Sequence, residues 1–197
     1  MIKAVIFDAG GVIITSSDSY AFLAKKVGVS KARMDEVRVK YMRPAQCGEL
    51  STDEFLTKLS EEFKVTKEKL RKLFEEGSKL MSVDNEVVKI VDKLNENGYR
   101  LAMITNTIEF YSKFEKETEV YRKFSPMVAS YQVGVRKPDP KIYEMVLKKL
   151  NLKGEECVFI DDHEEHLVPA AKLGMKTILF KNVTQLKREL KKLDVKI

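Results

Sequence analysis

Three short apolar runs, each of strand length and each ending in polar residues, constrain the fold of this chain more than any other feature. VIFDAGG occupies 5–11, AMITNT occupies 102–107 and CVFIDDHEEH occupies 157–166. Continuous apolar runs are typical of parallel strands that are covered by helices on both faces. Ligands of an open parallel sheet bind outside the carboxyl ends of its strands, so we expect these polar residues to meet at one edge.

Between the first and second of these runs the pattern changes from strand to helix. Apolar residues recur at three- and four-residue spacing across 16–81, as in amphipathic helices. Ser51 followed by Glu54 has the spacing of a capping box at a helix start. Strand–helix alternation then resumes and favours a parallel sheet. We predict an α/β fold in which a doubly wound parallel sheet, formed by 1–15 and 82–197, is interrupted by a compact helical insertion at 16–81.

The charge distribution argues against nucleic-acid binding, although the formal net charge is +6. The 36 Lys and Arg residues are interleaved with 30 Asp and Glu residues, as on a solvated mixed-charge surface. No apolar run approaches the roughly 18 residues of a membrane span. We expect no disulfide between Cys47 and Cys157, because Cys157 falls in a predicted buried strand. We therefore expect a cytoplasmic protein without nucleic-acid or membrane partners, and abundant Lys and Glu with no Trp indicate a thermophilic source.

Asp8 follows the first apolar run and precedes Gly10 and Gly11. Glycines at this point let the backbone turn sharply and approach a phosphate ligand closely. An aspartate so placed can attack phosphorus and form an acyl phosphate. The alternative is an ordinary turn aspartate whose carboxylate accepts a hydrogen bond from the adjacent backbone.

Asp161 and Asp162 are consecutive carboxylates at the end of another predicted strand. They would repel each other in a dry site, which favours a hard cation between them and Asp8. Mg²⁺ prefers oxygen ligands and commonly takes one or two carboxylates together with phosphate and water. The alternative is a pair of acidic residues at a helix start.

Two further segments supply groups that can bind phosphate. Thr105 and Asn106 offer a hydroxyl, an amide and backbone N–H groups, although Thr-Asn also forms ordinary turns at strand ends. Lys137 lies between Arg136 and a proline in VRKPDP at 135–140, where two prolines stiffen the backbone. Its ammonium could offset the repulsion between a carboxylate nucleophile and a phosphate dianion. An isolated lysine in such a segment is usually only a solvated surface residue.

Taken together, these residues resemble the motifs of the haloacid dehalogenase superfamily, most members of which are Mg²⁺-dependent phosphatases. Asp8 matches the nucleophile of the first motif, and Thr105 matches the Thr or Ser of the second. Lys137 matches the lysine of the third motif, and Asp161 with Asp162 matches the acidic fourth motif. The order and spacing of all four motifs agree with the family pattern.

The resemblance narrows to a subgroup that contains the bacterial glucose-1-phosphatase and the phosphatase domain of soluble epoxide hydrolase. It implies a Rossmann-like core, with 16–81 as an inserted helical cap domain that closes over the site and shapes substrate choice. It also implies Mg²⁺ held by Asp8, the backbone carbonyl of Gly10 and Asp162. Asp161 would be a further ligand of the ion or would orient the groups that bind it.

Two positions depart from the family pattern. Most phosphatases of the superfamily carry a second aspartate two residues after the nucleophile as general acid and base, and here that residue is Gly10. General acid–base assistance is worth roughly 10²–10⁴-fold in rate, so we expect modest turnover or substrates with good leaving groups, unless a substrate hydroxyl, water or another side chain substitutes. His166 stands where related sequences often have Asn. We expect His163 and His166 to lie behind the metal ligands or at the rim, because Mg²⁺ prefers oxygen.

These observations lead to three hypotheses. The first is Mg²⁺-dependent hydrolysis of a small phosphate ester through an aspartyl phosphate on Asp8, by a monomer or homodimer. The second is a haloacid dehalogenase that attacks carbon with Asp8 and needs no metal, and the pair Asp161-Asp162 argues against it. The third is a phosphate-ligand-binding protein without catalysis, which only Gly10 supports.

Overall fold

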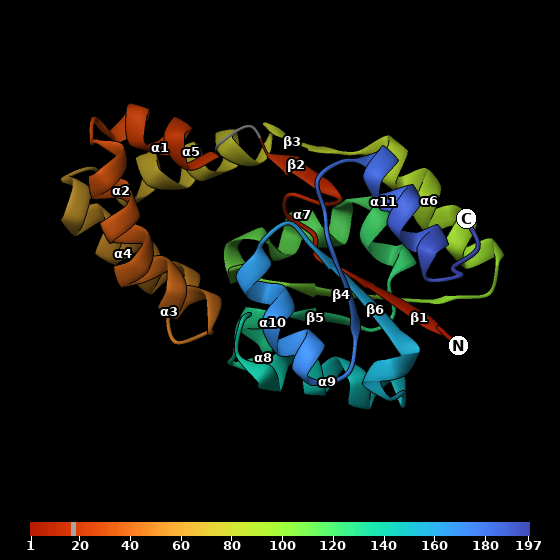
Figure 1. The fold of residues 1–197 in the computed structure, drawn as a ribbon. Coiled ribbons are helices and arrows are strands. Elements are labelled where there is room, and N and C mark those ends of the chain that lie inside the picture. The colour runs from red at the N-terminus through yellow and green to blue at the C-terminus, as the bar shows by residue number, and fades with distance from the viewer. Residues whose placement is uncertain (17–18) are drawn as a thin grey trace.

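Five parallel strands form the central sheet of this computed structural model, which describes residues 1–16 and 19–197 (Figure 1). Residues 17–18 of the predicted insertion lie outside the described residues. The order across the sheet is β5-β4-β1-β6-β7, so β1 lies between β4 and β6 and the polar segments that follow these three strands are neighbours. The strands are β1 (Ala4–Phe7), β4 (Arg100–Thr105), β5 (Met127–Ala129), β6 (Cys157–Asp161) and β7 (Lys176–Leu179).

Helices cover both faces of the sheet, which confirms the predicted doubly wound α/β fold. One face packs against α6 (Asn85–Glu96) and α11 (Val183–Lys192), and the other packs against α9 (Pro140–Leu150) and α10 (Glu164–Lys172). Successive strand residues point to opposite faces. Val5 and Phe7 accordingly lie in the first core, whereas Ala4 and Ile6 lie in the second.

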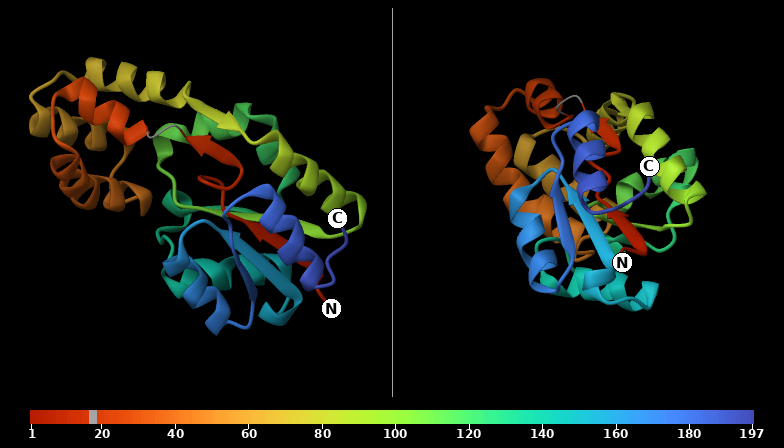
Figure 2. Two further views of the ribbon diagram at one scale, coloured as in Figure 1. Left: turned by 45° about the horizontal axis from the view of Figure 1, so that its top comes forward. Right: turned by 45° about the vertical axis from the view of Figure 1, so that its right-hand side comes forward.

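The predicted insertion is helical, and its hydrophobic core also includes Ile108 from the segment after β4. Its helices are α1 (Ser19–Val27), α2 (Lys31–Val37), the π-helix η1 (Arg38–Met42), α3 (Arg43–Gln46), α4 (Thr52–Phe63) and α5 (Lys67–Ser78). Phe55, Leu56 and Leu70 are almost completely buried among them. Figures 1 and 2 show these helices beyond the carboxyl ends of the strands, on the side of the sheet that carries the polar segments.

A two-stranded antiparallel ribbon joins the helical insertion to the sheet. β2 (Ile14–Ser16) pairs with β3 (Met81–Val83), and Ser16 lies opposite Met81. The predicted ends of the insertion, 16 and 81, therefore face each other across this ribbon.

Side-chain caps begin several of the helices, including the predicted one at Ser51. Ser51 and Glu54 form the capping box of α4. The Asp84 carboxylate accepts hydrogen bonds from two backbone N–H groups at the start of α6, and Asp139 caps α9 ahead of Pro140. Short helical segments complete the chain: η2 (Glu109–Tyr111), α7 (Ser112–Glu117), η3 (Glu119–Lys123), α8 (Ser130–Val133) and η4 (Gly154–Glu156).

In residues 1–16 and 19–197 no helix is long and apolar enough to cross a membrane. Cys157 is buried in β6, Cys47 is half-buried in the insertion, and both thiols are free, as expected. The cytoplasmic location, the thermophilic source and the oligomeric state stay predictions from the sequence.

Candidate active site

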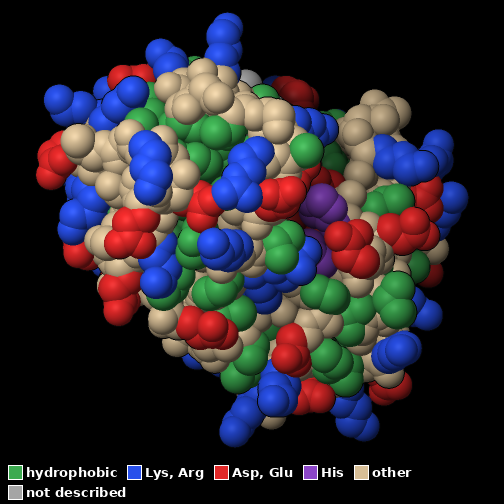
Figure 3. All heavy atoms as spheres, turned by 90° about the vertical axis from the view of Figure 1, so that its left-hand side faces the viewer, with side chains coloured by type: hydrophobic (Ala, Val, Ile, Leu, Met, Phe, Trp, Pro, Cys, Tyr) green, Lys and Arg blue, Asp and Glu red, His purple; other side chains and the backbone are tan. Residues whose placement is uncertain are grey.

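A cavity of about 580 Å³ opens at the carboxyl ends of β1, β4 and β6, between the sheet and the helical insertion. Figure 3 views the molecule from the side of the insertion and shows the two histidines among acidic and basic side chains. The sheet side of the cavity includes Asp8, Gly10, Gly11, Thr105, Asn106 and Asp162. The insertion side includes Arg38, Val39, Met42, Arg43 and Gln46. The predicted polar segments therefore meet at one site.

Asp8 leaves the central strand β1 with its side chain buried at the base of the cavity. Its Oδ1 accepts a hydrogen bond of 2.6 Å from the backbone N–H of Ala9 and lies 2.8 Å from the Nζ of Lys137. Burial raises the pKa of Asp8 to about 7, although the charge of Lys137 opposes this shift. The lysine therefore favours the ionised form of a carboxylate that has lost most of its water.

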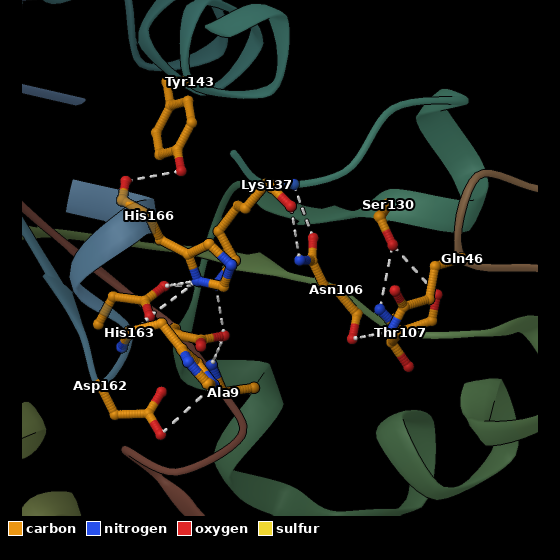
Figure 4. A network of polar contacts seen from close by, with 12 residues as sticks. Ala9, Gln46, Asn106, Thr107, Ser130, Lys137, Tyr143, Asp162, His163 and His166 are labelled. Carbon is orange, nitrogen blue, oxygen red and sulfur yellow. Dashed lines mark hydrogen bonds and ion pairs between the residues drawn. The ribbon is translucent and has the colours of Figure 1, made fainter. Parts of the chain in front are cut away.

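Lys137 is fully buried and bridges two carboxylates beneath the cavity. Its Nζ lies 2.8 Å from Asp8 Oδ1 and 2.6 Å from Asp161 Oδ2. The Asn106 side chain holds the Lys137 backbone at two points: Oδ1 accepts from the Lys137 N–H at 2.8 Å, and Nδ2 donates to its carbonyl at 3.0 Å (Figure 4). The Asn106 amide, which we expected to bind phosphate, makes both of these bonds to the Lys137 backbone, and Asn106 also lines the cavity.

Asp161 lies behind Asp8 and is completely buried. Its Oδ1 accepts hydrogen bonds from the backbone N–H of His163 at 2.9 Å and from His166 Nδ1 at 3.0 Å. Burial raises the pKa of Asp161, but the hydrogen bond from His166 and the charge of Lys137 outweigh it and lower the pKa to about 2. Tyr143 donates to the His166 carbonyl at 2.7 Å and so fixes the start of α10 (Figure 4). His166 lies within this network, whereas His163 is exposed at the rim.

Asp162 differs from its neighbour, because it lines the cavity and is only partly buried. Its Oδ1 is shielded from solvent and has no hydrogen-bond partner within the described part of the chain. Burial raises the pKa of Asp162. Gly11 lies directly against this carboxylate: a Cβ at Gly11 would be 2.1 Å from Asp162 Oδ2, and the φ of +79° also favours glycine.

The carboxylates fit a divalent cation on the cavity side, at Asp162, but not between Asp8 and Asp161. Asp8, Asp161 and His166 bring ligand atoms within 4.8 Å of one another. The Lys137 ammonium already bridges Asp8 and Asp161, and a metal ion there would be repelled by it. The unpartnered oxygen of Asp162, on the cavity side, is the kind of hard oxygen donor that Mg²⁺ takes.

Thr105, the last residue of β4, is buried against the cavity. The chain beyond it is held by Ser130, at the start of α8. The Thr107 N–H donates to Ser130 Oγ at 3.0 Å, and Ser130 Oγ donates to the Thr107 carbonyl at 3.1 Å. The backbone after β4 is therefore fixed from the neighbouring strand.

A model for the haloacid dehalogenase-like hydrolases matches residues 2–174. The chain belongs to this family of hydrolases. The resemblance seen in the four motifs is thereby confirmed for nearly the whole chain.

Several curated proteins are similar to this hydrolase. The pig bifunctional epoxide hydrolase 2 is 27% identical over 97% of the chain, and the chain spans only 38% of that protein. The sesquiterpene phosphatase astK of Aspergillus oryzae is 26% identical, with 88% of the chain and 87% of the phosphatase covered. The D-ribitol-5-phosphate phosphatase of Bacteroides thetaiotaomicron is 27% identical, with 96% of the chain and 97% of that protein covered.

Solved structures of the family share the fold of this hydrolase. A predicted family hydrolase from Porphyromonas gingivalis superposes with a TM-score of 0.80 and 24% identity, covering 96% of this chain and 98% of that one. A family enzyme from Bacteroides thetaiotaomicron, in complex with magnesium and inorganic phosphate, gives a TM-score of 0.76 with 23% identity over 92% and 95% of the two chains.

Other residues of the hydrolase reach the site without a sequence signal that singled them out. Gln46 of the insertion accepts a hydrogen bond of 2.8 Å from Arg136 Nε and donates one of 3.4 Å to the Asn106 carbonyl. Glu115 of α7 lines the cavity and is buried. Ser130 directly follows the short strand β5. It could have been predicted in the same way as the other site residues, as a polar residue at the carboxyl end of a strand.

Proposed function

We propose that the hydrolase is a magnesium-dependent phosphatase that cleaves a small phosphate ester through an aspartyl phosphate on Asp8. One observation carries the proposal: the Asp8 carboxylate lies at the base of the cavity, 2.8 Å from the buried Lys137 ammonium. A largely desolvated carboxylate beside a fixed cation that favours its ionised form is suited to act as a nucleophile. The phosphatases among the similar proteins support the same reaction class.

The two aspartates after β6 would have separate roles. Asp162, with its unpartnered oxygen, would hold Mg²⁺ together with Asp8 and the backbone carbonyl of Gly10. When bound, the ion would neutralise charge on the phosphate oxygens. Asp161 would orient Lys137 from behind, because its oxygens already accept hydrogen bonds from Lys137 and His166.

The groups around Asp8 would then carry the two displacements. A carboxylate oxygen of Asp8 attacks phosphorus, the ester P–O bond breaks, and the leaving oxygen takes the bonding electrons and needs a proton to depart as an alcohol. The Thr105 hydroxyl, backbone N–H groups after β4 and Lys137 spread the charge of the transferring group. Water attacks the aspartyl phosphate in the second displacement, releasing orthophosphate and restoring the Asp8 carboxylate. Asn106 contributes by holding the Lys137 backbone.

We further propose that 16–81 is a cap over a core formed by 1–15 and 82–197. The joining ribbon and a hydrophobic core built mainly from the insertion's own helices support a separate unit, and Ile108 packs this unit against the segment after β4. Because the insertion supplies one whole wall of the cavity, its residues would select the ester.

A dehalogenase is the second candidate function, since a dehalogenase structure also superposes with a TM-score of 0.67 at 22% identity, covering 89% of this chain and 83% of that one. Attack on carbon would leave the buried oxygen of Asp162 without any role or partner. This oxygen favours the metal-dependent phosphatase. A phosphate-binding protein without turnover is the third candidate.

The proposal is tested by phosphate release from p-nitrophenyl phosphate, ribitol 5-phosphate, glyceraldehyde 3-phosphate and glucose 1-phosphate, with Mg²⁺ and with EDTA. We expect Mg²⁺-dependent release that falls by roughly 10³-fold or more in Asp8→Asn, because the nucleophile is lost. Asp92→Asn, a partly exposed aspartate paired with Lys123, is the matched control and should retain activity. Full activity of Asp8→Asn would show that Asp8 is not the nucleophile. Phosphate release that EDTA does not reduce would show that the reaction does not depend on Mg²⁺.

A further inference from the structure

Gly10 leaves the cavity without the side chain that would protonate a leaving alcohol. A Cβ built on Gly10 would meet no atom within 4 Å, so the space beside the phosphate site is open. An alkoxide is a poor leaving group unless it is protonated as the P–O bond breaks. Another group on the cavity wall would have to supply that proton.

Glu115 is a buried carboxyl group on this wall that the steps above do not use. It lies on α7, lines the cavity and is only 7% exposed. Its carboxyl group is hydrogen-bonded to the Thr107 side chain, two residues beyond Thr105. The Thr107 backbone is fixed in turn by Ser130, so the position of Glu115 is coupled to the phosphate-binding end of β4.

Tyr121 lines the same cavity as Glu115 and Asp8. Burial raises the pKa of the Tyr121 phenol, and the charges of Glu115 and of Asp8 both raise it further. All three side chains line the same cavity, and the charges of both carboxylates act on this phenol.

The surroundings of Glu115 favour its protonated form. Burial raises the pKa of the Glu115 carboxyl, while the hydrogen bond from Thr107 and the charge of Lys116 oppose the shift. The other titratable groups affected by its charge are the phenols of Tyr121 and Tyr131. A carboxyl group that keeps its proton closer to neutral pH is the kind of group that serves as a general acid.

We propose that Glu115 is the general acid and base of the phosphatase reaction and replaces the side chain that Gly10 lacks. This assignment rests on the proposed phosphatase function. As the Asp8 oxygen bonds to phosphorus and the ester P–O bond breaks, the Glu115 proton moves to the leaving oxygen and yields an alcohol and a carboxylate. That carboxylate then takes a proton from the water that attacks the aspartyl phosphate. Orthophosphate leaves, and Glu115 is protonated again.

The test compares two leaving groups in Glu115→Gln, which keeps the size and a hydrogen-bonding group but carries no transferable proton. The alkyl phosphate is the one that the wild type cleaves fastest among ribitol 5-phosphate, glyceraldehyde 3-phosphate and glucose 1-phosphate. In Glu115→Gln, the first turnover of this substrate should slow by about 100-fold or more. Nitrophenolate is a stable leaving group, so its release in the first turnover should change by less than about threefold. Later turnovers should be slow, because water attack has lost its base.

The pH dependence supplies a readout that a structural role would not move. In the wild type, kcat/KM for the alkyl phosphate should fall at high pH as Glu115 loses its proton, and Glu115→Gln should lack this decrease. Glu117→Gln, two residues along α7 and exposed beside Lys113, is the matched control and should behave as the wild type.

Gly10→Asp in the Glu115→Gln background tests directly whether Glu115 does the work of the side chain that Gly10 lacks. The open space at Gly10 admits the new side chain, and we expect alkyl phosphate cleavage to recover by at least about tenfold. Equal slowing of both first turnovers, or an unaffected alkyl phosphate, overturns the proposal. So does a wild type that cleaves p-nitrophenyl phosphate but no alkyl phosphate. If the wild type released no phosphate from any of these substrates, the phosphatase function itself would be rejected.

Discussion

The two walls of the cavity are built in different ways. On the sheet side, the groups beneath the nucleophile are buried and paired: Lys137 and Asp161 are both 0% exposed and lie 2.6 Å apart. On the insertion side, Arg38 and Arg43 are exposed, and Val39 is 53% exposed. One wall is a fixed polar network, and the other consists mostly of exposed side chains, with Met42 buried and Gln46 half-buried among them.

From this difference we infer that the sheet wall carries out the reaction and that the insertion wall selects the substrate. A site that stabilises charge needs groups held in place by packing and by further hydrogen bonds, which the sheet provides through Asn106 and His166. A wall that must admit a whole substrate can be built from side chains that move. We therefore expect substitutions in the sheet wall to affect turnover strongly, and substitutions in the insertion wall to affect mainly KM.

The largest effect should come from Lys137→Ala. Removing the ammonium leaves Asp8 and Asp161 buried without their cation, and breaking a buried ion pair destabilises a protein by about 3–5 kcal/mol. We expect a loss of this size in the free energy of unfolding in urea, together with loss of phosphatase activity. Lys149→Ala, an exposed lysine on α9, is the control. A change below about 1 kcal/mol would mean that the paired network does not hold the sheet wall together.

Asp162→Asn should separate activity from stability. The Asp162 Oδ1 has no partner within the described residues, so its replacement breaks no hydrogen bond at that atom, and the free energy of unfolding should change by less than about 1 kcal/mol. Activity at low Mg²⁺ should fall by about 100-fold, because a neutral amide replaces an anionic oxygen ligand. The concentration of Mg²⁺ that gives half-maximal activity measures this effect.

Glu164→Gln, an exposed neighbour on α10, is the control for Asp162→Asn and should keep the wild-type Mg²⁺ dependence. An Asp162→Asn protein that is destabilised as strongly as Lys137→Ala would contradict the distinction between the two groups. Unchanged Mg²⁺ dependence would remove Asp162 from the metal site.

The sheet wall was largely predictable from the sequence, for a geometric reason. Parallel strands end at one edge, so Asp8, Thr105 and Asp162 could be assigned to one site from the apolar runs before them. The contact between the Asn106 side chain and the Lys137 backbone was not predictable in this way. Its amide binds the Lys137 backbone 31 residues away, and no local pattern encodes that contact.

The insertion wall was predictable only as a set of helices. Helical periodicity marked the stretch, and the Ser51–Glu54 capping box was confirmed. Which side chains face the cavity depends on how the helices pack against the sheet. Gln46 reaches Arg136 across 90 residues of sequence, a distance over which spacing carries no information.

The smallest effect should come from Gln46→Ala, which tests the contact between the two walls. Gln46 links the insertion to Arg136 and to the Asn106 carbonyl by hydrogen bonds of 2.8 and 3.4 Å. Losing such half-buried bonds should lower the free energy of unfolding by about 1 kcal/mol and raise KM by up to about tenfold, with kcat little changed. Gln132→Ala, an exposed glutamine whose side chain donates to Tyr131, is the matched control. A loss of kcat comparable to that of Lys137→Ala would show that the insertion wall belongs to the fixed network and that reaction and selection are not divided between the walls.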